Sequence, residues 1–205
     1  MKAIILAAGV GKRLWQVTQH RPKCLIEIGG RTLLHRYLTS LRSVGIQRVD
    51  MVVGYKEDMI RAAVAADSCG VRVNFLVNEQ FHRGSISSLW IARTALDDDA
   101  IVMDADVLFH QEILRRLVQS PYPNALLMDE TVKQTGEECM VVVEGGYRGG
   151  RAPGSPCFVS GAWMVGWILL SSPVSRHGTS FRQRCRDGRS CHGPPVSTAA
   201  IEDVA

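Results

Sequence analysis

The chain has 205 residues, of which 46% are hydrophobic and 21% charged, a length and composition typical of a globular protein with one main domain. Its net charge of +4 belongs to residues 147–205, because residues 1–146 carry 17 basic and 17 acidic side chains. This distribution argues against a nucleic-acid-binding surface on the main domain, and we expect no nucleic-acid partner.

Membrane insertion and secretion are also disfavoured. The first apolar run ends at Ala8, too early for a signal-peptide core, and the longest later run, 162–170, has nine residues where a spanning helix needs about 20. The six cysteines form no Cys-x-x-Cys pair, which favours a reducing compartment. A metal site of Cys185, Cys191 and His192 is disfavoured because no fourth ligand lies at a suitable spacing. We expect a cytoplasmic protein without a membrane partner.

Apolar periodicity predicts alternating strands and helices along residues 1–128. Strands are expected at 2–6, 48–53, 71–77, 100–103 and 125–128. Helices are expected at 32–44, 57–66, 85–96 and 111–119. This order indicates an α/β fold, with a Rossmann-like, open, mostly parallel sheet and helices on both faces. Right-handed crossovers would bring the loops after the strands to one edge of the sheet, where such folds bind ligands.

The sequence changes in character near residue 146, so we predict one domain over 1–146 and an atypical tail over 147–205. The tail holds 5 of the 8 prolines, 8 of the 19 glycines, 7 arginines and no lysine. Its stretches RGGRAPGSP and SFRQRCRDGRSCHGPP show neither helical nor strand periodicity. A flexible appendage and a shifted reading frame in GC-rich coding DNA both explain this composition, and we favour the second.

The loop after the first strand, LAAGVGKRL, combines glycines with cations and is followed by Pro22-Lys23. It is not a P-loop, because arginine rather than Ser or Thr follows its GK pair, and it lacks the third glycine of the dinucleotide fingerprint. Glycines let backbone N–H groups approach phosphate oxygens, arginine offers a planar fork and lysine a point charge. Together with the acidic strand end DADV at 104–107, the pattern predicts a phosphate-binding site rather than a tight turn with solvated cations.

Five motifs, in the expected order, resemble the nucleotidyltransferase (NTP transferase) family. They are LAAGVGKRL, RPKCLIEIGGRTLL, VVGYKEDMI, NEQFHRGSISSLWIAR and VMDADVLFH, within residues 1–145. The family includes sugar-phosphate nucleotidylyltransferases and phosphocholine cytidylyltransferases. The fourth motif and DADV are most similar to the bacterial phosphocholine or aminoethylphosphonate cytidylyltransferases, because sugar-nucleotide members more often carry a GD pair at that strand end.

This resemblance implies an enzyme of the nucleotidyltransferase class. Its expected reaction transfers CMP from CTP to a small phosphorylated acceptor, such as phosphocholine or aminoethylphosphonate, with release of pyrophosphate. One alternative is a sugar-1-phosphate nucleotidylyltransferase that uses UTP, dTTP or GTP. The other is a truncated nucleotide-binding protein without turnover. The oligomeric state does not follow from the sequence.

The resemblance also implies which residues form the site. The nucleotide-binding set would be Leu6, Ala8, Gly9, Gly11, Lys12, Arg13 and Lys23. Its first three members would face the base and ribose, and the others the phosphates. Lys23, between the α-phosphate and the incoming phosphate, and Arg13, near the departing pyrophosphate, are the expected catalytic residues. Asp106 would hold the Mg²⁺ cofactor, unless it caps a following helix, while Asp104 is expected to be structural.

Further residues of the matching motifs keep more than one interpretation. Asn78, Glu79 and Ser85 could shape the nucleotide or acceptor pocket, and Ser85 could equally cap the helix that follows it. Tyr55 fits a pocket and strand-end packing equally well. For Trp90 we favour core packing over a contact with a choline-like cation.

The tail departs from the family pattern. Members usually contribute a second metal-binding carboxylate from a late strand. The late acidic pair of this chain, Glu202 and Asp203, lies in sequence unlike the family, and we assign it no role. A missing second carboxylate is what motivates the alternative of a binding protein without turnover.

Overall fold

The computed structural model describes residues 1–121 and six later strands, and the chain divides into two compact units, residues 1–115 and 116–205. The strands of the first unit are β1 (Lys2–Leu6), β2 (Glu27–Ile28), β3 (Arg31–Thr32), β4 (Arg48–Val53), β5 (Arg72–Val77) and β6 (Ala100–Asp104). The helices are α1 (Trp15–Thr18), α2 (Leu33–Ser43), α3 (Glu57–Ala66), α4 (Ser85–Ala92) and α5 (Gln111–Val118), the last crossing the division between the units.

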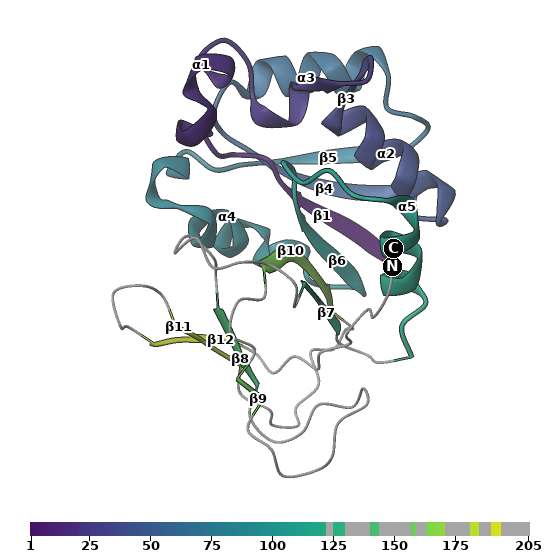
Figure 1. Ribbon diagram of the computed structural model, residues 1–205. Coiled ribbons are helices and arrows are strands. Elements are labelled where there is room, and N and C mark those ends of the chain that lie inside the picture. The colour runs from purple at the N-terminus through teal and green to yellow at the C-terminus, as the bar shows by residue number, and fades with distance from the viewer. Residues whose placement is uncertain are drawn as a thin grey trace. The chain divides into compact units, whose positions relative to one another are not determined.

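A parallel sheet in the order β5-β4-β1-β6 organises the first unit (Figure 1). In β1 and β6 nearly every residue is buried, so these strands read as continuous apolar runs with helices on both faces. β5 alternates between exposed and half-buried positions, as expected at a sheet edge. Side chains such as Ile4, Met51 and Met103 are fully buried and form the core along the sheet.

The connections set where the sheet can bind a ligand. After β1 the chain passes through α2 and α3 to β4 and β5, and it then returns by α4 to place β6 on the other side of β1. Right-handed crossovers put α2 and α3 on one face and α4 on the other, as Figure 1 shows. The strand order therefore reverses between β1 and β6, and the loops after these two strands diverge there. The predicted α/β fold is confirmed.

The predicted elements of residues 1–121 agree with the structure to within a few residues. β4 and α3 have the predicted bounds, and α2 begins after Thr32, whose hydroxyl accepts the His35 backbone N–H at 3.1 Å. The largest difference is in the predicted helix 85–96, which ends as α4 at Ala92 and continues as a short 3-10 turn. The β2–β3 hairpin and α1 were not predicted, because two- to four-residue elements carry no periodicity.

The second unit is described through strands alone. They are β7 (Ala125–Asp129), β8 (Met140–Val143), β9 (Cys157–Phe158), β10 (Trp163–Leu170), β11 (Phe181–Arg184) and β12 (Ser190–Gly193). β7 pairs with β10, and β8 pairs with both β9 and β11, all antiparallel; β11 also pairs with β12. Residues 181–184 and 190–193 of SFRQRCRDGRSCHGPP therefore form strands although the stretch shows no strand periodicity. Backbone pairing does not require alternating apolar side chains.

Residues 163–170 of the apolar run 162–170, too short for a membrane span, form β10. Among the helices that the structure describes, none is long and apolar enough to cross a membrane. The predicted boundary at residue 146 stays a prediction.

Candidate functional site

Lys23 and Asp106 meet where β1 and β6 end, although they lie 83 residues apart in the sequence. The Lys23 Nζ donates to Asp106 Oδ2 at 2.5 Å. Lys23 begins a 3-10 turn that Pro22 precedes in extended conformation, and Asp106 lies in the turn after β6. Their side chains remain 23% and 37% exposed, so phosphate and metal ions can reach both. The structure thus joins the predicted catalytic cation to the predicted metal ligand.

Gly11 allows the loop after β1 to pack against Lys23. Its φ of +74° lies in the left-handed region. A Cβ at this position would lie 2.7 Å from two side-chain carbons of Lys23 and 3.1 Å from Cγ2 of Thr18. Both the backbone conformation and the close approach therefore require glycine at this position. The aliphatic part of the Lys23 side chain packs directly against the loop.

Thr18, which the sequence did not single out, and Tyr55 brace this loop. Thr18 is fully buried, and its hydroxyl lies 3.0 Å from the carbonyl oxygens of Gly11 and Leu14, to which it donates. The Tyr55 hydroxyl lies 3.2 Å from the carbonyl oxygens of Thr18 and Gln19. The Tyr55 backbone N–H donates to the Ala8 carbonyl at 3.1 Å. Of the two interpretations offered for Tyr55, the structure supports packing at the strand end, here as a brace between β4 and the loop.

The turn that carries Asp106 is held from α2. The buried Tyr37 hydroxyl lies 2.6 Å from the Asp104 carbonyl and 2.9 Å from the Val107 carbonyl, and it accepts the Val107 N–H at 3.1 Å. The ring of Phe109 packs edge-on against Tyr37 with ring centroids 5.0 Å apart. These contacts fix the backbone on both sides of Asp106, so the carboxylate is placed without being buried.

The pKa of Asp104 is raised, which fits the structural role expected of this residue. Burial, followed by the negative charge of Asp106, raises the pKa of Asp104 to about 6, although Lys23 acts in the opposite direction. Two carboxyl groups near one lysine leave an excess of negative charge when both ionise. A hard divalent cation such as Mg²⁺ would relieve this repulsion, so the donor set fits the expected cofactor, with Asp106 as the accessible ligand.

Cys24 follows Lys23 in sequence but does not fit a catalytic role. It is 2% exposed, and burial raises the pKa of its thiol to about 12. A protonated, buried thiol is a poor nucleophile, so the site offers cations and backbone groups rather than a covalent nucleophile.

The other predicted nucleotide-binding residues follow β1 directly. The Leu6 carbonyl accepts the Ala105 N–H at 3.2 Å, which joins the two loops at their start. Ala8 is buried, Gly9 is exposed, and Lys12 carries an exposed side chain on a short 3-10 turn. The backbone of Arg13 belongs to the same turn, and its side chain lies outside the described residues.

The helix-cap interpretation of Asp106 is wrong, because α5 begins only at Gln111. Ser85 is the first residue of α4, and Gly84 occupies the N-cap position without a side-chain cap, so the capping role expected of Ser85 is also wrong. The side chain of Ser85 lies outside the described residues.

Asn78 is buried and structural. Its amide nitrogen lies 3.0 Å from the hydroxyl oxygens of Ser87 and Ser88, and its carbonyl oxygen accepts the Gln80 N–H at 3.0 Å. These bonds attach the start of α4 to the end of β5. Glu79 is exposed beside it.

Trp90 does not pack in the core, contrary to expectation. Its side chain is 65% exposed, and the Arg93 guanidinium lies 4.1 Å from the ring centroid. The helical spacing of apolar residues failed here because α4 is apolar on more than one side, so periodicity alone could not select the buried face. The tail residues Cys185, Glu202 and Asp203, considered above as a metal ligand and late acids, lie outside the described residues, as do the side chains of Cys191 and His192 in β12.

Known proteins of similar sequence are nucleotidyltransferases. The chain is 33% identical over 127 residues to a CMP-5'-(3-aminopropyl)phosphonate synthase of Streptomyces rubellomurinus, covering 62% of this chain and 20% of that protein. It is 35% identical over 114 residues to a choline-phosphate cytidylyltransferase of Haemophilus influenzae, covering 55% of this chain and 47% of that protein. The chain thus spans between a fifth and about half of these relatives.

The fold is similar to that of solved nucleotidyltransferases. The inositol-1-phosphate CTP transferase from T. maritima matches with a TM-score of 0.64 at 22% identity, over 84% of this chain and 71% of that one. The model of the MobA-like NTP transferase domain matches residues 3–167, which include the loop after β1, the Lys23–Asp106 pair and the first part of β10. The chain therefore belongs to the MobA-like NTP transferase domain family.

Proposed function

We propose that this protein transfers CMP from CTP to a small phosphorylated acceptor and releases pyrophosphate in a Mg²⁺-dependent reaction. The observation that carries the proposal is the 2.5 Å contact between Lys23 and Asp106 at the point where the strand order reverses. A cation and a metal-binding carboxylate at one position can bring two anionic substrates together, which is the main difficulty of this reaction.

The reaction needs no general base. The second pKa of a phosphomonoester is about 6, so the acceptor is largely a dianion at neutral pH. One of its oxygens attacks the α-phosphorus of CTP, forming a new P–O bond, while the bond from the α-phosphorus to the bridging oxygen breaks and pyrophosphate leaves with that electron pair. Lys23 would leave Asp106 and stabilise the negative charge between the two phosphates. Mg²⁺, when bound, would neutralise charge on the triphosphate, and Asp106 would hold it.

The loop residues have separate parts in this scheme. Gly11 and its neighbours would offer backbone N–H groups to the β- and γ-phosphates, and Arg13 would stabilise the departing pyrophosphate. Thr18 and Tyr55 keep the loop in position through its carbonyl groups. The geometry pre-organises the loop, which saves the cost of ordering it when the nucleotide binds.

The choice of CTP and of a small acceptor rests on the relatives. The Streptomyces, Haemophilus and T. maritima proteins bear names of enzymes that form CMP or cytidylyl products, with phosphonate, choline phosphate and inositol phosphate as acceptors. A sugar 1-phosphate acceptor with UTP, dTTP or GTP is the alternative. A sugar 1-phosphate resembles inositol phosphate because both carry a phosphate on a polyhydroxylated ring.

Pyrophosphate release tests the proposal. The protein is incubated with each of CTP, UTP, GTP, dTTP and ATP against phosphocholine, aminoethylphosphonate, inositol 1-phosphate and glucose 1-phosphate. We expect turnover with CTP and one of the first two acceptors. Replacing Lys23 with Ala, or Asp106 with Ala, should lower kcat by about 100-fold or more, because each removes a charge that acts on the transition state.

The matched control is Arg48→Ala. Arg48 pairs with Asp98 at 2.5 Å near the amino ends of the strands, so this variant also removes one cation of an ion pair, away from the site. It should keep the activity of the unchanged protein. Unchanged activity in both site variants would overturn the residue assignment. Calorimetric binding of CTP without pyrophosphate release under any condition would instead select a nucleotide-binding protein without turnover.

A further inference from the structure

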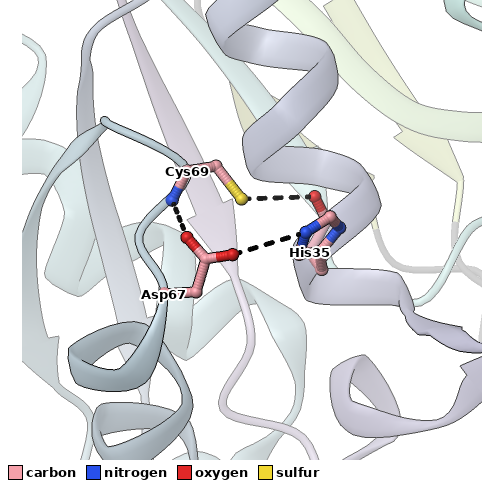
Figure 2. Close-up of side chains that lie close together, drawn as sticks. All are labelled: His35, Asp67 and Cys69. Carbon is pink, nitrogen blue, oxygen red and sulfur yellow. Dashed lines mark hydrogen bonds and ion pairs between the residues drawn. The ribbon is translucent and has the colours of Figure 1, made fainter.

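Three side chains with metal-binding atoms meet beside the loop that leads into β5. His35 lies on α2, and Asp67 and Cys69 lie on the loop between α3 and β5 (Figure 2). This loop leads into β5 at Arg72, which pairs with Arg48 at the amino end of β4. We propose that His35, Asp67 and Cys69 bind a divalent transition-metal ion of the zinc type, a site separate from the one that the proposed reaction uses.

The spacing of the donor atoms fits a shared ion. The ligand atoms of all three side chains lie within 4.8 Å of one another. The His35 Nε2 and Asp67 Oδ2 are 3.5 Å apart, which is long for a hydrogen bond. Two ligand atoms bound to one tetrahedral Zn²⁺ at about 2.0–2.1 Å are separated by about 3.4 Å. The nitrogen and oxygen therefore already have the separation that a bridging ion requires.

The sulfur completes a donor set that zinc prefers. The Cys69 Sγ lies beside α2, 3.5 Å from the Thr39 hydroxyl and 3.9 Å from the His35 carbonyl oxygen. A tetrahedral ion with a Zn–S bond of about 2.3 Å would place the sulfur about 3.6 Å from the nitrogen and the oxygen. The Cys69 Sγ lies within 4.8 Å of both atoms, so a shift of about 1 Å would reach this geometry. Imidazole, carboxylate and thiolate leave one tetrahedral position for water. The two anionic ligands neutralise the ion.

The histidine ring lacks a strong partner at either nitrogen. Besides the long contact of Nε2 with Asp67, the Nδ1 atom is buried and has no hydrogen-bond partner among the described residues. A buried polar atom without a partner is uncommon in a native protein. Nε2 is the ring nitrogen that faces Asp67, so it is the atom available to an ion. The side chain of His35 is 33% exposed, so an ion can enter from solvent.

The turn keeps one oxygen of Asp67 available. Its Oδ1 accepts the Cys69 backbone N–H at 2.8 Å, while Oδ2 faces the ring, as Figure 2 shows. Arg42 lies along the same turn, since a Cβ on Gly70 would be 3.7 Å from its Nε. This positive charge disfavours ions that are held by charge alone, such as Mg²⁺ or Ca²⁺, whereas thiolate and imidazole select softer ions.

Cobalt titration of the full chain tests the site. Reduced protein, treated with a chelator and desalted, is titrated with Co²⁺ and then with Zn²⁺. We expect about one equivalent of Co²⁺ to produce a thiolate-to-cobalt charge-transfer absorption, which Zn²⁺ then removes because it binds more tightly. Excess Mg²⁺ should leave the absorption unchanged.

Single replacements locate the ion. Cys69→Ser should abolish the charge-transfer absorption, and His35→Gln should weaken Co²⁺ binding by about 10-fold or more. Asp67→Asn keeps an oxygen that can accept the Cys69 N–H but loses the anionic ligand. We therefore expect this variant to bind Co²⁺ more weakly, while its melting temperature without metal stays close to that of the unchanged protein. Lys23→Ala, which tests the proposed reaction, should bind Co²⁺ normally.

The matched control removes the three tail residues that the sequence analysis considered as metal ligands. A variant with Cys185→Ser, Cys191→Ser and His192→Ala together should keep the absorption. An absorption that survives Cys69→Ser, or that disappears in the tail variant, would overturn the assignment. No binding at one equivalent in the unchanged protein would also overturn it. If Cys69→Ser does not fold, the Asp67→Asn and His35→Gln affinities still decide the question.

Discussion

At the scale of single residues, Gly11 lets the loop after β1 pack against the side chain of Lys23. Replacing it with Ala adds a Cβ at a φ of +74° and 2.7 Å from side-chain carbons of Lys23. The left-handed conformation alone costs about 1–2 kcal/mol for a residue with a Cβ. We expect Gly11→Ala to lose both stability and CTP affinity, as measured by denaturant unfolding and calorimetry.

Gly45→Ala is the control for this prediction. Gly45 also has a positive φ, +85°, but a Cβ there would have no atom within 4 Å. This variant should show the loss of stability and normal CTP binding. Equal losses of CTP affinity in the two variants would show that the contact with Lys23 has no role in nucleotide binding.

The acidity of Asp104 makes the stability of the protein depend on pH. Its pKa in the folded state is about 6, above the ordinary value of 3.8 for an aspartic acid, so the folded state holds the proton more tightly than the unfolded state. The stability that this protonation contributes is present below pH 4 and is lost as the pH rises to about 6 and beyond. A pKa shift of this size changes the free energy of unfolding by at most about 3 kcal/mol.

Asp104→Asn tests this at the same residue. The variant removes the titration, so its unfolding free energy should exceed that of the unchanged protein at pH 7 and the difference should shrink as the pH falls to 4. Urea unfolding at several pH values measures both curves. Parallel curves would contradict the assignment of the shift to Asp104.

At the scale of elements, α2 holds the turn after β6 through one hydroxyl group. Tyr37→Phe removes the partner of the Val107 N–H and a donor to the Asp104 carbonyl in a buried place. Leaving such groups without partners costs about 1–3 kcal/mol. We expect lower stability and a lower kcat for pyrophosphate release, because the backbone on both sides of Asp106 loses its support.

Thr32→Ala is the control that distinguishes a loss of α2 stability from a loss of the contacts beside Asp106. It removes the N-cap of the same helix, whose hydroxyl accepts the His35 N–H, at a cost of about 1 kcal/mol. This variant should lose stability while keeping its kcat at a temperature where it is folded. A similar decrease of kcat in both variants would mean that Tyr37 acts only through the stability of α2.

At the scale of the whole molecule, nucleotide binding should be visible as global stability. A ligand that binds only the folded state at about 100 times its Kd adds about 2.7 kcal/mol, or about 5–10 °C in Tm for a chain of this size. We expect CTP with Mg²⁺ to produce this shift in a thermal melt, and a chelator or Lys23→Ala to remove most of it. An equal shift with every nucleoside triphosphate would argue against cytidine preference.

Much of the first unit was predictable because local patterns report local structure. The apolar runs of β1 and β6 and the helical spacing of α2 follow from which positions must be buried. The periodicity was insufficient for Trp90, where an apolar helix gave no single buried face. It was also insufficient for β11 and β12, whose pairing is a property of two segments rather than one.

By itself, the sequence determined the order of strands and helices, the glycine and cation content of the loop after β1, and the acidic end of β6. Only the tertiary structure decided that Lys23 meets Asp106, that Tyr37 and Thr18 hold the two loops, and that His35 meets Asp67 and Cys69. Contacts across tens of residues depend on strand register and on the hand and order of the crossovers. No local pattern of residues encodes these properties, so the composition of each loop could be read in advance while its partners could not.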